Sequence, residues 1–463
     1  MAHYRRYDAS IEALGAPIAV RAVASRPEQK GAFAVRNIAA GEVLWREAPI
    51  LSVQHVARRQ CVAVCVECCR WVGGGVDMLD RVIKWATGAT AAARSLPAPD
   101  AAISCQEDCG AVYCSVECRS MAWKIHHRML CTGCGAAATP DRLSKGAAIH
   151  RGALLCYERL ADKADCRELL ELLARSVSDV LGVWDAEGRT DAGLASAMSV
   201  YDSLHCVHWW DVPGRGSEAA LRPLVQEAVR LLDLALLPCH RRETPALFAV
   251  DRCARLLGGF ESNLLSVEIE CPAIQRLALD ERAKVHSHDA TPVGDQITFP
   301  TGMLQQAAAA VATRAAATRA AAARTNRASL VDTMVMDAGL ECSASSSSSS
   351  SSSSLPAITI PSPANFSTSS LTAQPFLSDS WPRSEGVGLF DLISTVNHSC
   401  VPSCCVSYTD SHVACITATR AIESGEELSI SYIDTRLDYA NRQRELADYG
   451  FSCECEKCQC ERK

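Results

Sequence analysis

The sequence GVGLFDLISTVNHSCVPS, residues 386–403, decides how the rest of this chain is interpreted. It lies in a longer segment, residues 385–435, whose pattern is typical of β-structure. Further along that segment, Leu428, Ile430 and Tyr432 share one strand face, because side chains on a strand repeat every two residues. We therefore expect a β-rich core near the C-terminus, with the polar sequence Asn-His-Ser-Cys inside it.

A second β-rich segment is expected near the N-terminus, within residues 16–54. Apolar residues there alternate with smaller or polar neighbours, and Gly31 and Gly41 mark turns. After the C-terminal β segment, residues 438–449 form a predicted helix, and Gly450 is well placed as its C-cap.

Between the two β segments, the apolar period becomes helical. Two stripes of apolar residues have spacings of three and four, which place each stripe on one helix face. They are Leu169, Leu173, Val177 and Val180, and then Leu224, Ala228, Leu231 and Ala235. Pro238 ends the second stripe. These stripes predict a helical region over residues 140–280.

The composition changes over residues 281–384. Ala307–Ala323 is dominated by Ala, Thr and Arg, and Ser345–Ser354 is an unbroken serine run. Too few large apolar residues remain there to offset the entropy of ordering the chain. We predict a disordered, low-complexity insertion.

Composition also limits the class of protein. The 463 residues allow two to four domains of about 100–200 residues. The net charge of −7 argues against a polybasic coat for nucleic acid, so direct nucleic-acid binding is not expected. The first residues are not followed by a signal-like apolar stretch, and no run approaches about 18 uncharged apolar residues. We expect neither secretion nor membrane insertion.

The 25 cysteines are the strongest chemical signal. In a chain expected to stay in a reducing compartment, clustered cysteines indicate metal ligation rather than disulfides. Thiolate sulfur and imidazole nitrogen suit tetrahedral zinc, and four protein ligands close a structural site. We expect two interleaved sites: Cys65, Cys68, Cys114 and Cys118 on one ion, and Cys105, Cys109, His127 and Cys131 on the other. The remaining alternatives nearby are His126, Cys61, Cys69 and Cys134.

The segment YCSVECRSMAWKIHHRMLC, Tyr113–Cys131, resembles a MYND zinc finger. The Tyr-Cys-Ser-x2-Cys order, the tryptophan and the His-x3-Cys pair are all present. The gap from Cys68 to Cys105 is longer than usual, and three residues rather than two separate Cys105 from Cys109. The resemblance implies a proline-rich peptide as a partner of the finger.

The opening stretch, together with GEELSISYID at 425–434 and YGFSCECEKC at 449–458, resembles a SET-domain protein lysine methyltransferase. Residues 30–53 resemble the first strands of the same domain. A MYND finger that splits a SET domain is the architecture of the SET-and-MYND family. The C-terminal segment is most similar to the plant trithorax-related branch of that family.

This resemblance implies an α+β fold: a SET-domain β-fold with a threaded pseudoknot around Asn397–Cys400. An inserted finger, a helical insert that shapes the substrate groove and a zinc-binding tail complete it. The implied parts are residues 16–60 and 385–435 for the SET core, 61–134 for the finger, 140–280 for the helical insert, 281–384 for the disordered insertion, and 436–463 for the tail.

Tyr432 is the expected catalytic residue. A methyl-transfer site must hold a sulfonium donor and a neutral lysine amine in line and exclude water. A tyrosine hydroxyl at the end of a strand can orient the amine and the methyl group. The alternative is a core tyrosine that completes the face of Leu428 and Ile430.

The implied methyl donor is S-adenosylmethionine. The residues expected to bind it are Gly31, Ala32, Phe33, Asn263, Asn397, His398 and Phe451. The glycine allows close approach of backbone groups, although Gln29 stands where the family usually has a further glycine. Phe451 stacks on the adenine in the family pattern. The alternatives are a core role for His398 and packing under the tail for Phe451.

A third zinc site is implied at the C-terminus, which gives about three zinc ions in total. Its expected ligands are Cys400, Cys453, Cys455 and Cys458, with Cys460 as the alternative. This site would fix the tail, and with it Phe451, over the cofactor pocket.

Two functions remain open at this point. The first is a protein-lysine N-methyltransferase that acts on a lysine-bearing tail, by resemblance histone H3, with non-histone substrates also open. Such an enzyme would regulate chromatin, in the nucleus and/or the cytoplasm. The second is a zinc-stabilised adaptor with little or no activity. Binding of S-adenosylmethionine would separate them.

Overall fold

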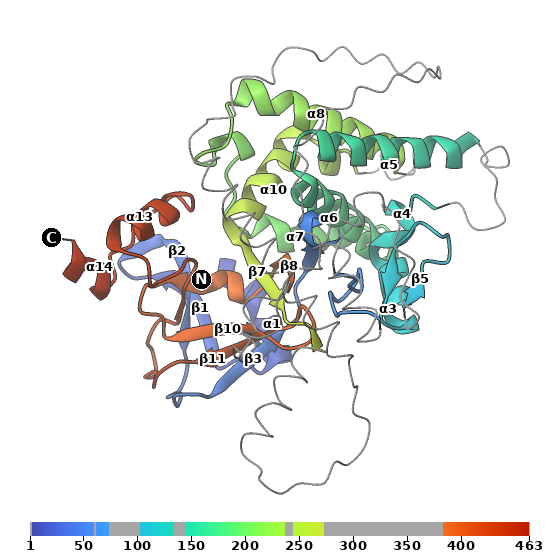
Figure 1. The fold of residues 1–463 in the computed structure, drawn as a ribbon. Coiled ribbons are helices and arrows are strands. Elements are labelled where there is room, and N and C mark those ends of the chain that lie inside the picture. The colour runs from blue at the N-terminus through green and yellow to red at the C-terminus, as the bar shows by residue number, and fades with distance from the viewer. Residues whose placement is uncertain are drawn as a thin grey trace, which may run out of the picture.

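The computed structural model describes residues 2–59, 62–73, 102–133, 145–236, 244–272 and 383–462 (Figure 1). The predicted disordered insertion lies outside these residues except for its last two positions, and so do Cys61 and Cys134. Figure 1 shows strands from both ends of the chain together, with the helices of residues 145–263 gathered on one side of them. The predicted α+β class is confirmed.

The β core is built from segments far apart in the sequence. The strands from the N-terminal part are β1 (Ile18–Val23), β2 (Arg26–Ala34), β3 (Val43–Glu47) and β4 (Leu51–Gln54). Those from the C-terminal part are β8 (Ser384–Leu389), β9 (Asn397–His398), β10 (Cys404–Tyr408), β11 (Ala414–Ala418) and β12 (Ser429–Ile430). One sheet has the order β10-β11-β3, and a second has the order β4-β8-β7.

Apolar residues explain why these segments meet. Ile416 on β11 pairs with Trp45 on β3, and both side chains are buried. Leu428 and Ile430 are also buried in the same cluster, as their shared strand face predicted. Tyr432, however, lies beyond the end of β12 and only packs against this core.

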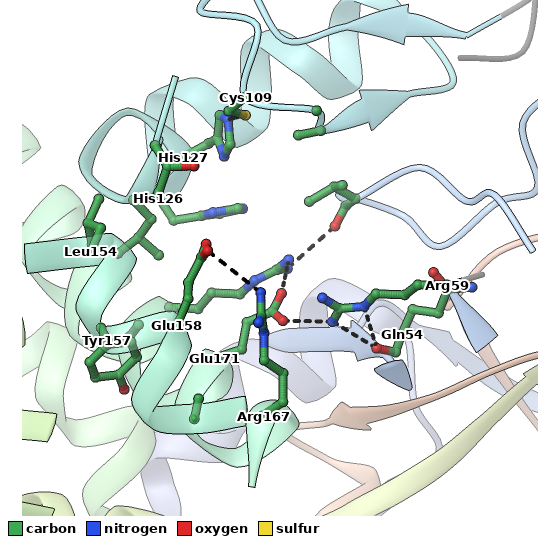
Figure 2. Close-up of a pocket in the computed structure, with 18 of the residues that line it drawn as sticks. Gln54, Arg59, Cys109, His126, His127, Leu154, Tyr157, Glu158, Arg167 and Glu171 are labelled. Carbon is green, nitrogen blue, oxygen red and sulfur yellow. Dashed lines mark hydrogen bonds and ion pairs between the residues drawn. The ribbon is translucent and has the colours of Figure 1, made fainter. Parts of the chain in front are cut away.

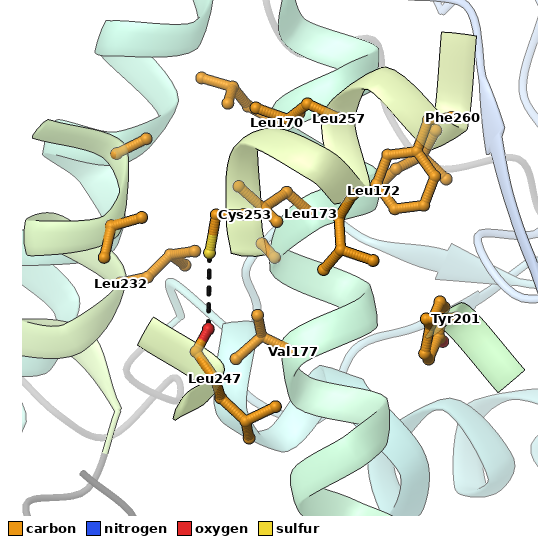
Figure 3. Close-up of a cluster of buried hydrophobic side chains, with 14 of the residues drawn as sticks. Leu170, Leu172, Leu173, Val177, Tyr201, Leu232, Leu247, Cys253, Leu257 and Phe260 are labelled. Atoms are coloured by element: carbon orange, nitrogen blue, oxygen red, sulfur yellow. Dashed lines mark hydrogen bonds between the residues drawn. The ribbon is translucent and has the colours of Figure 1, made fainter. Parts of the chain in front are cut away.

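The helical region consists of α5 (Lys145–Lys163), α6 (Arg167–Ala186), α7 (Asp191–Asp202), α8 (Glu218–Ala235) and α10 (Val250–Asn263). Its core contains Leu173 and Val177 from the first predicted stripe, packed against Leu232 and Leu257 (Figure 3). From the second predicted stripe, Ala228 and Leu231 lie in the same core, whereas Ala235 belongs to a small neighbouring cluster.

The region predicted to be helical ends in a strand, β7 (Leu264–Ile269). Val267 and Ile269 are buried, and Glu268 between them is exposed. That alternation has the period of a strand, and β7 pairs antiparallel with β8 from Leu264 opposite Leu389 onward. The helical prediction was wrong for this segment: the two helical stripes were extended to residue 280 across a stretch whose own alternation is that of a strand.

The finger is small and projects beside α6 (Figure 1). It contains β5 (Ile103–Ser104), β6 (Val112–Tyr113), α3 (Val116–Ala122), a π-helical turn at Trp123–His127 and α4 (Arg128–Leu130). Ser115 caps α3, because its hydroxyl accepts a hydrogen bond from the Cys118 amide at 3.1 Å.

Two further helices close the C-terminus: α13 (Tyr439–Ala447) and α14 (Glu456–Glu461). The carboxylate of Asp438 caps α13 by accepting from the Asn441 amide at 2.9 Å. At the other end of the chain, a helical segment that we did not predict, α1 (Asp8–Leu14), precedes β1. No helix within the described ranges is both long enough and apolar enough to cross a membrane.

Candidate functional site

The candidate site forms where β9 lies parallel to β12. Asn397 is paired with Ser429, and His398 is paired with Ile430. The Ser399 amide also donates to the Ile430 carbonyl at 2.9 Å. Two short polar segments, about thirty residues apart in sequence, are thereby fixed next to each other.

Asn397 connects β9 to the second strand of the chain. Its side-chain amide donates to the Lys30 carbonyl at 2.9 Å and to the Glu427 carboxylate at 2.7 Å. A Cβ atom at Gly31 would lie 2.9 Å from that carboxylate and 3.2 Å from the Asn397 nitrogen. The Val23 methyl group lies 3.0 Å from the same position, so a side chain at residue 31 would collide and glycine is required for this close approach.

The residues after Gly31 play different parts. Ala32 is fully buried, and its carbonyl accepts from the Leu428 amide at 2.8 Å. The Phe33 ring is covered by the guanidinium of Arg21, 4.1 Å from the ring centroid. Ala32, through this hydrogen bond, and Phe33, through its bridge to Glu427, hold β2 against the 427–428 segment, and Gly31 lies against Glu427 and Asn397.

Asn263 lies at the end of α10 and belongs to a neighbouring group. Its side-chain amide donates to the carbonyls of His205 at 2.9 Å and Gly259 at 2.7 Å. The ammonium group of Lys30 donates to the Ser203 carbonyl at 3.1 Å. The 203–205 turn therefore connects Asn263 to the strand that carries Gly31.

An aromatic group borders the site on the other side of His398. The His398 ring centroid lies 5.4 Å from that of Tyr432 and 6.0 Å from that of Phe451. Tyr432 and Phe451 meet edge to face at 6.4 Å, and Tyr449 lies 5.3 Å from Tyr432. Such offset arrangements are favourable for aromatic pairs, and they give the site a half-buried aromatic wall.

The hydroxyl of Tyr432 has a defined direction and protonation state. It donates to the Val396 carbonyl at 2.8 Å. Burial raises the pKa of Tyr432, and the nearby Tyr449 and Glu427 raise it further. The phenol is therefore protonated at neutral pH, so it cannot act as a base, but its oxygen can still accept a hydrogen bond from an amine.

His398 is neutral in the same environment. Burial, assisted by the positive charge of Arg442, lowers the pKa of His398 to about 4. Its Nδ1 accepts a hydrogen bond from the Tyr432 amide at 3.0 Å, and its Nε2 lies 3.3 Å from the Cys400 sulfur.

One residue that sequence reasoning missed holds the approach to β9. The buried carboxylate of Glu47 accepts from the amides of Leu392 and Ile393 at 2.8 and 3.1 Å, and from the Trp45 indole at 3.1 Å. Burial raises the pKa of Glu47, although these donors partly offset the effect. Its position on the same strand face as Trp45 was the available signal, since a charged residue is rarely buried without partners.

Three groups of thiol and imidazole ligands lie within the described residues. In each group the ligand atoms all lie within 4.8 Å of one another. The groups are Cys65, Cys68, Cys114 and Cys118; Cys105, Cys109, His127 and Cys131; and Cys400, Cys453, Cys455 and Cys458.

Sulfur–sulfur distances test the fit to zinc. They are 3.6 Å for Cys68–Cys114, 3.8 Å for Cys105–Cys131 and 3.5 Å for Cys400–Cys458. A tetrahedron with zinc–sulfur bonds of about 2.3 Å has edges of about 3.8 Å. The spacing of the donors therefore fits a four-coordinate zinc ion in each group.

The alternative ligands lie elsewhere. The Nε2 of His127 is 3.3 Å from the sulfurs of both Cys105 and Cys109, whereas that of His126 contacts the Glu67 carboxylate at 3.1 Å. Cys69 is buried beside the Ser52 hydroxyl, and Cys460 is exposed.

A cavity of about 330 Å³ separates the finger from α5 and α6 (Figure 2). Its wall contains a network in which the Glu171 carboxylate receives Arg59 at 2.7 Å and Arg175 at 3.0 Å. Burial alone would raise the pKa of Glu171, but the two guanidinium groups lower it to about 2. Because Arg175 also donates to the Val66 carbonyl at 3.4 Å, this network ties the finger to the helices.

Comparison with known proteins identifies the fold. The SET domain profile matches residues 29–433. The chain is similar to a SET and MYND domain-containing protein of Dictyostelium discoideum, at 40% identity over 74 residues, which is 16% of this chain and 22% of that protein.

Two further relatives carry enzyme names. Histone-lysine N-methyltransferase SMYD3 of Mus musculus is 42% identical over 79 residues, 17% of this chain and 18% of the relative. Histone-lysine N-methyltransferase ATXR2 of Arabidopsis thaliana is 47% identical over 77 residues, 16% of each chain. The matched regions thus span about a fifth of the length of these relatives. The SET domain profile itself spans most of this chain, and the chain therefore belongs to the SET domain family.

Proposed function

We propose that this protein is an S-adenosylmethionine-dependent protein-lysine N-methyltransferase. The observation that carries the proposal is the placement of the Tyr432 hydroxyl. It donates to the carbonyl of Val396, the residue before β9, and lies near enough to Glu427 for that carboxylate to raise the pKa of Tyr432; Glu427 in turn accepts from Asn397 beside Gly31. Methyl transfer needs polar groups that hold the methyl donor and, beside them, a hydroxyl that orients the lysine amine.

The residues of this chain divide the work between them. Gly31, Asn397 and the backbone of His398 would hold the amino-acid and adenosine ends of the cofactor, and Phe451 would cover the adenine. S-adenosylmethionine, when bound, supplies the electrophilic methyl group. The Tyr432 oxygen accepts a hydrogen bond from the lysine amine and directs its lone pair. The aromatic rings around His398 would line the apolar side of the reaction site and limit the access of water to it.

Zinc has a structural part in this proposal. Each of the three ligand groups closes a four-coordinate site, which leaves no position for substrate. The zinc ion of the tail would fix α14 and the segment that carries Phe451. About three ions per chain are proposed, together with a proline-rich peptide as the partner of the finger.

The substrate proposal rests on relatives. SMYD3 and ATXR2 are named histone-lysine N-methyltransferases, whereas SMYD5 of Gallus gallus, 39% identical over 79 residues, is named a protein-lysine N-trimethyltransferase. A lysine-bearing protein tail is therefore the proposed substrate class. Histone H3, chromatin regulation and a nuclear and/or cytoplasmic location are the finer proposals.

Calorimetric titration with S-adenosylmethionine, followed by methyl transfer to a peptide array, tests this function. Binding and transfer to lysine-containing peptides are expected. Transfer that is lost when the target lysine is replaced by arginine would support lysine as the acceptor. A zinc-loaded, folded chain that binds no S-adenosylmethionine would instead favour the adaptor.

A further inference from the structure

The ring of His398 lies between the tail thiol group and the backbone of Tyr432. Its Nδ1 lies 3.0 Å from the Tyr432 backbone nitrogen, and its Nε2 lies 3.3 Å from the Cys400 sulfur. A backbone N–H can only donate, so Nδ1 must be the acceptor and carry no proton. The hydrogen of the neutral ring is then on Nε2, and it points to the sulfur.

We propose that His398 is a positioning residue that connects the tail zinc site to Tyr432, an inference that rests on the proposed function. The ring donates to the sulfur of Cys400, a ligand of that site, and accepts from the amide of Tyr432. The Tyr432 hydroxyl in turn donates to Val396, two residues before His398. The backbone and the side chain of Tyr432 are thus both held by the segment 396–398.

Other sulfurs of the tail site also accept hydrogen bonds. The side chains of Arg442 and Gln443 donate to the Cys458 sulfur at 3.5 and 3.4 Å, and the Cys455 amide donates to the Cys453 sulfur at 3.5 Å. All of these donors belong to the tail itself. Cys400 differs in that it accepts from Arg442 of the tail and also from His398 on β9, inside the candidate site.

The connection gives the tail zinc a second effect besides fixing Phe451. Groups that hydrogen-bond to metal ligands orient those ligands, and replacing such groups typically costs about 10–100-fold in metal affinity or activity. Here the effect also runs the other way. The zinc ligand Cys400 orients the His398 ring, and the ring holds the backbone of Tyr432. Loss of the tail metal would therefore loosen Tyr432 even where the cofactor still binds.

Two substitutions separate the role of Nδ1 from that of Nε2. In His398→Asn, the side-chain oxygen takes roughly the place of Nδ1, so the acceptor for Tyr432 remains and the donor to Cys400 is lost. In His398→Gln, the amide nitrogen takes roughly the place of Nε2, so the donor remains and the acceptor is lost. If the His398 ring only filled space, both variants would lose the same packing, and their effects should be equal.

The experiment uses the full chain with cadmium-113 in place of zinc, observed by NMR. Three cadmium signals are expected, and Gln443→Leu identifies the tail signal, because it removes a donor to Cys458. His398→Asn should shift this signal alone, and His398→Gln should shift it much less. For both variants, kcat with saturating S-adenosylmethionine should fall about tenfold or more.

A tail signal that does not move in His398→Asn would overturn the proposed contact, and so would equal shifts in both variants. Unchanged kcat in both variants would overturn the positioning role. The cadmium readout does not depend on activity. A wild type without methyltransferase activity, whose tail signal still shifts in His398→Asn, would reject the proposed function while supporting the contact.

Discussion

The helical region and the C-terminal tail are stabilised by different forces. In α6, Leu170, Leu172, Leu173 and Leu181 are fully buried within one large apolar cluster. In the tail, the buried cluster consists of Leu446 and three thiols, those of Cys400, Cys453 and Cys458. The first region can fold by removing apolar surface from water, whereas the second needs an ion to bring its thiols together.

Removal of zinc should show this difference most strongly. Because the binding free energy of a structural zinc ion is folding free energy, of the order of 10 kcal/mol per site, a strong chelator should unfold the tail and the finger. Hydrogen exchange followed by mass spectrometry should then show lost protection over residues 102–133 and 439–462. Residues 167–186 should keep theirs. Unchanged protection in the tail after complete removal of zinc would contradict the comparison.

A core truncation tests the helical side. Leu173→Ala should lower the free energy of unfolding by about 2–5 kcal/mol, because it removes buried methyl groups and leaves a cavity. Leu234→Ala on α8 is the matched control, since Leu234 is 42% exposed, and it should cost far less. Denaturant unfolding of both variants provides the measurement, and equal losses would show that the cluster is not closely packed.

Acid should weaken the junction between the finger and the helices. Glu171 has a folded-state pKa of about 2, below its ordinary value of 4.5. The stabilisation is therefore fully present above about pH 4.5 and is lost as the pH falls toward 2, with a maximum of about 3 kcal/mol.

Glu171→Gln, compared with the wild type at each pH, isolates this contribution, because acid release of zinc affects both proteins. The difference in unfolding free energy should be largest near pH 6 and shrink below about pH 4.5. A difference that stays constant down to pH 3 would exclude Glu171 as the source.

The smallest expected effect is at the cap of the tail helix. Asp438→Ala should cost about 1 kcal/mol, because the Asn441 amide loses its acceptor. Asp438→Asn keeps a side-chain oxygen and should be nearly neutral. Both are measured with zinc bound. A cost as large as that of Leu173→Ala would mean that the tail depends on local helix stability rather than on its thiols.

Sequence reasoning reached the features that are encoded locally. Cysteine spacing predicted two groups of four ligands and the family resemblance implied the third, and the structure brings together the same twelve side chains. The spacing of Leu173 and Val177 predicted a buried helix face in the same way. The helical repeat lies within a short stretch of chain, and so does each closely spaced cysteine pair, although a complete ligand group joins cysteines 46 to 58 residues apart.

The remaining features depend on contacts across hundreds of residues. Asn397 donates to the Lys30 carbonyl from 367 positions away, and Glu47 receives the Leu392 amide from 345 positions away. No periodicity carries such information. Strand β7 is a different case, because the alternation of Val267, Glu268 and Ile269 was a local signal that the helical prediction for residues 140–280 passed over. The connection from Cys400 through His398 was missed for another reason: it depends on the orientation of a ring, which residue spacing does not determine.

The most direct test of the central claim is Tyr432→Phe. The substitution removes only the hydroxyl, while the proposed cofactor contacts of Gly31 and Asn397 remain. Methyl transfer to a validated lysine peptide should fall by at least about tenfold, and the affinity for S-adenosylmethionine should stay within about threefold, because the lost interaction acts mainly in the transition state. Full methyl transfer by Tyr432→Phe would contradict the account and leave Tyr432 as a packing residue.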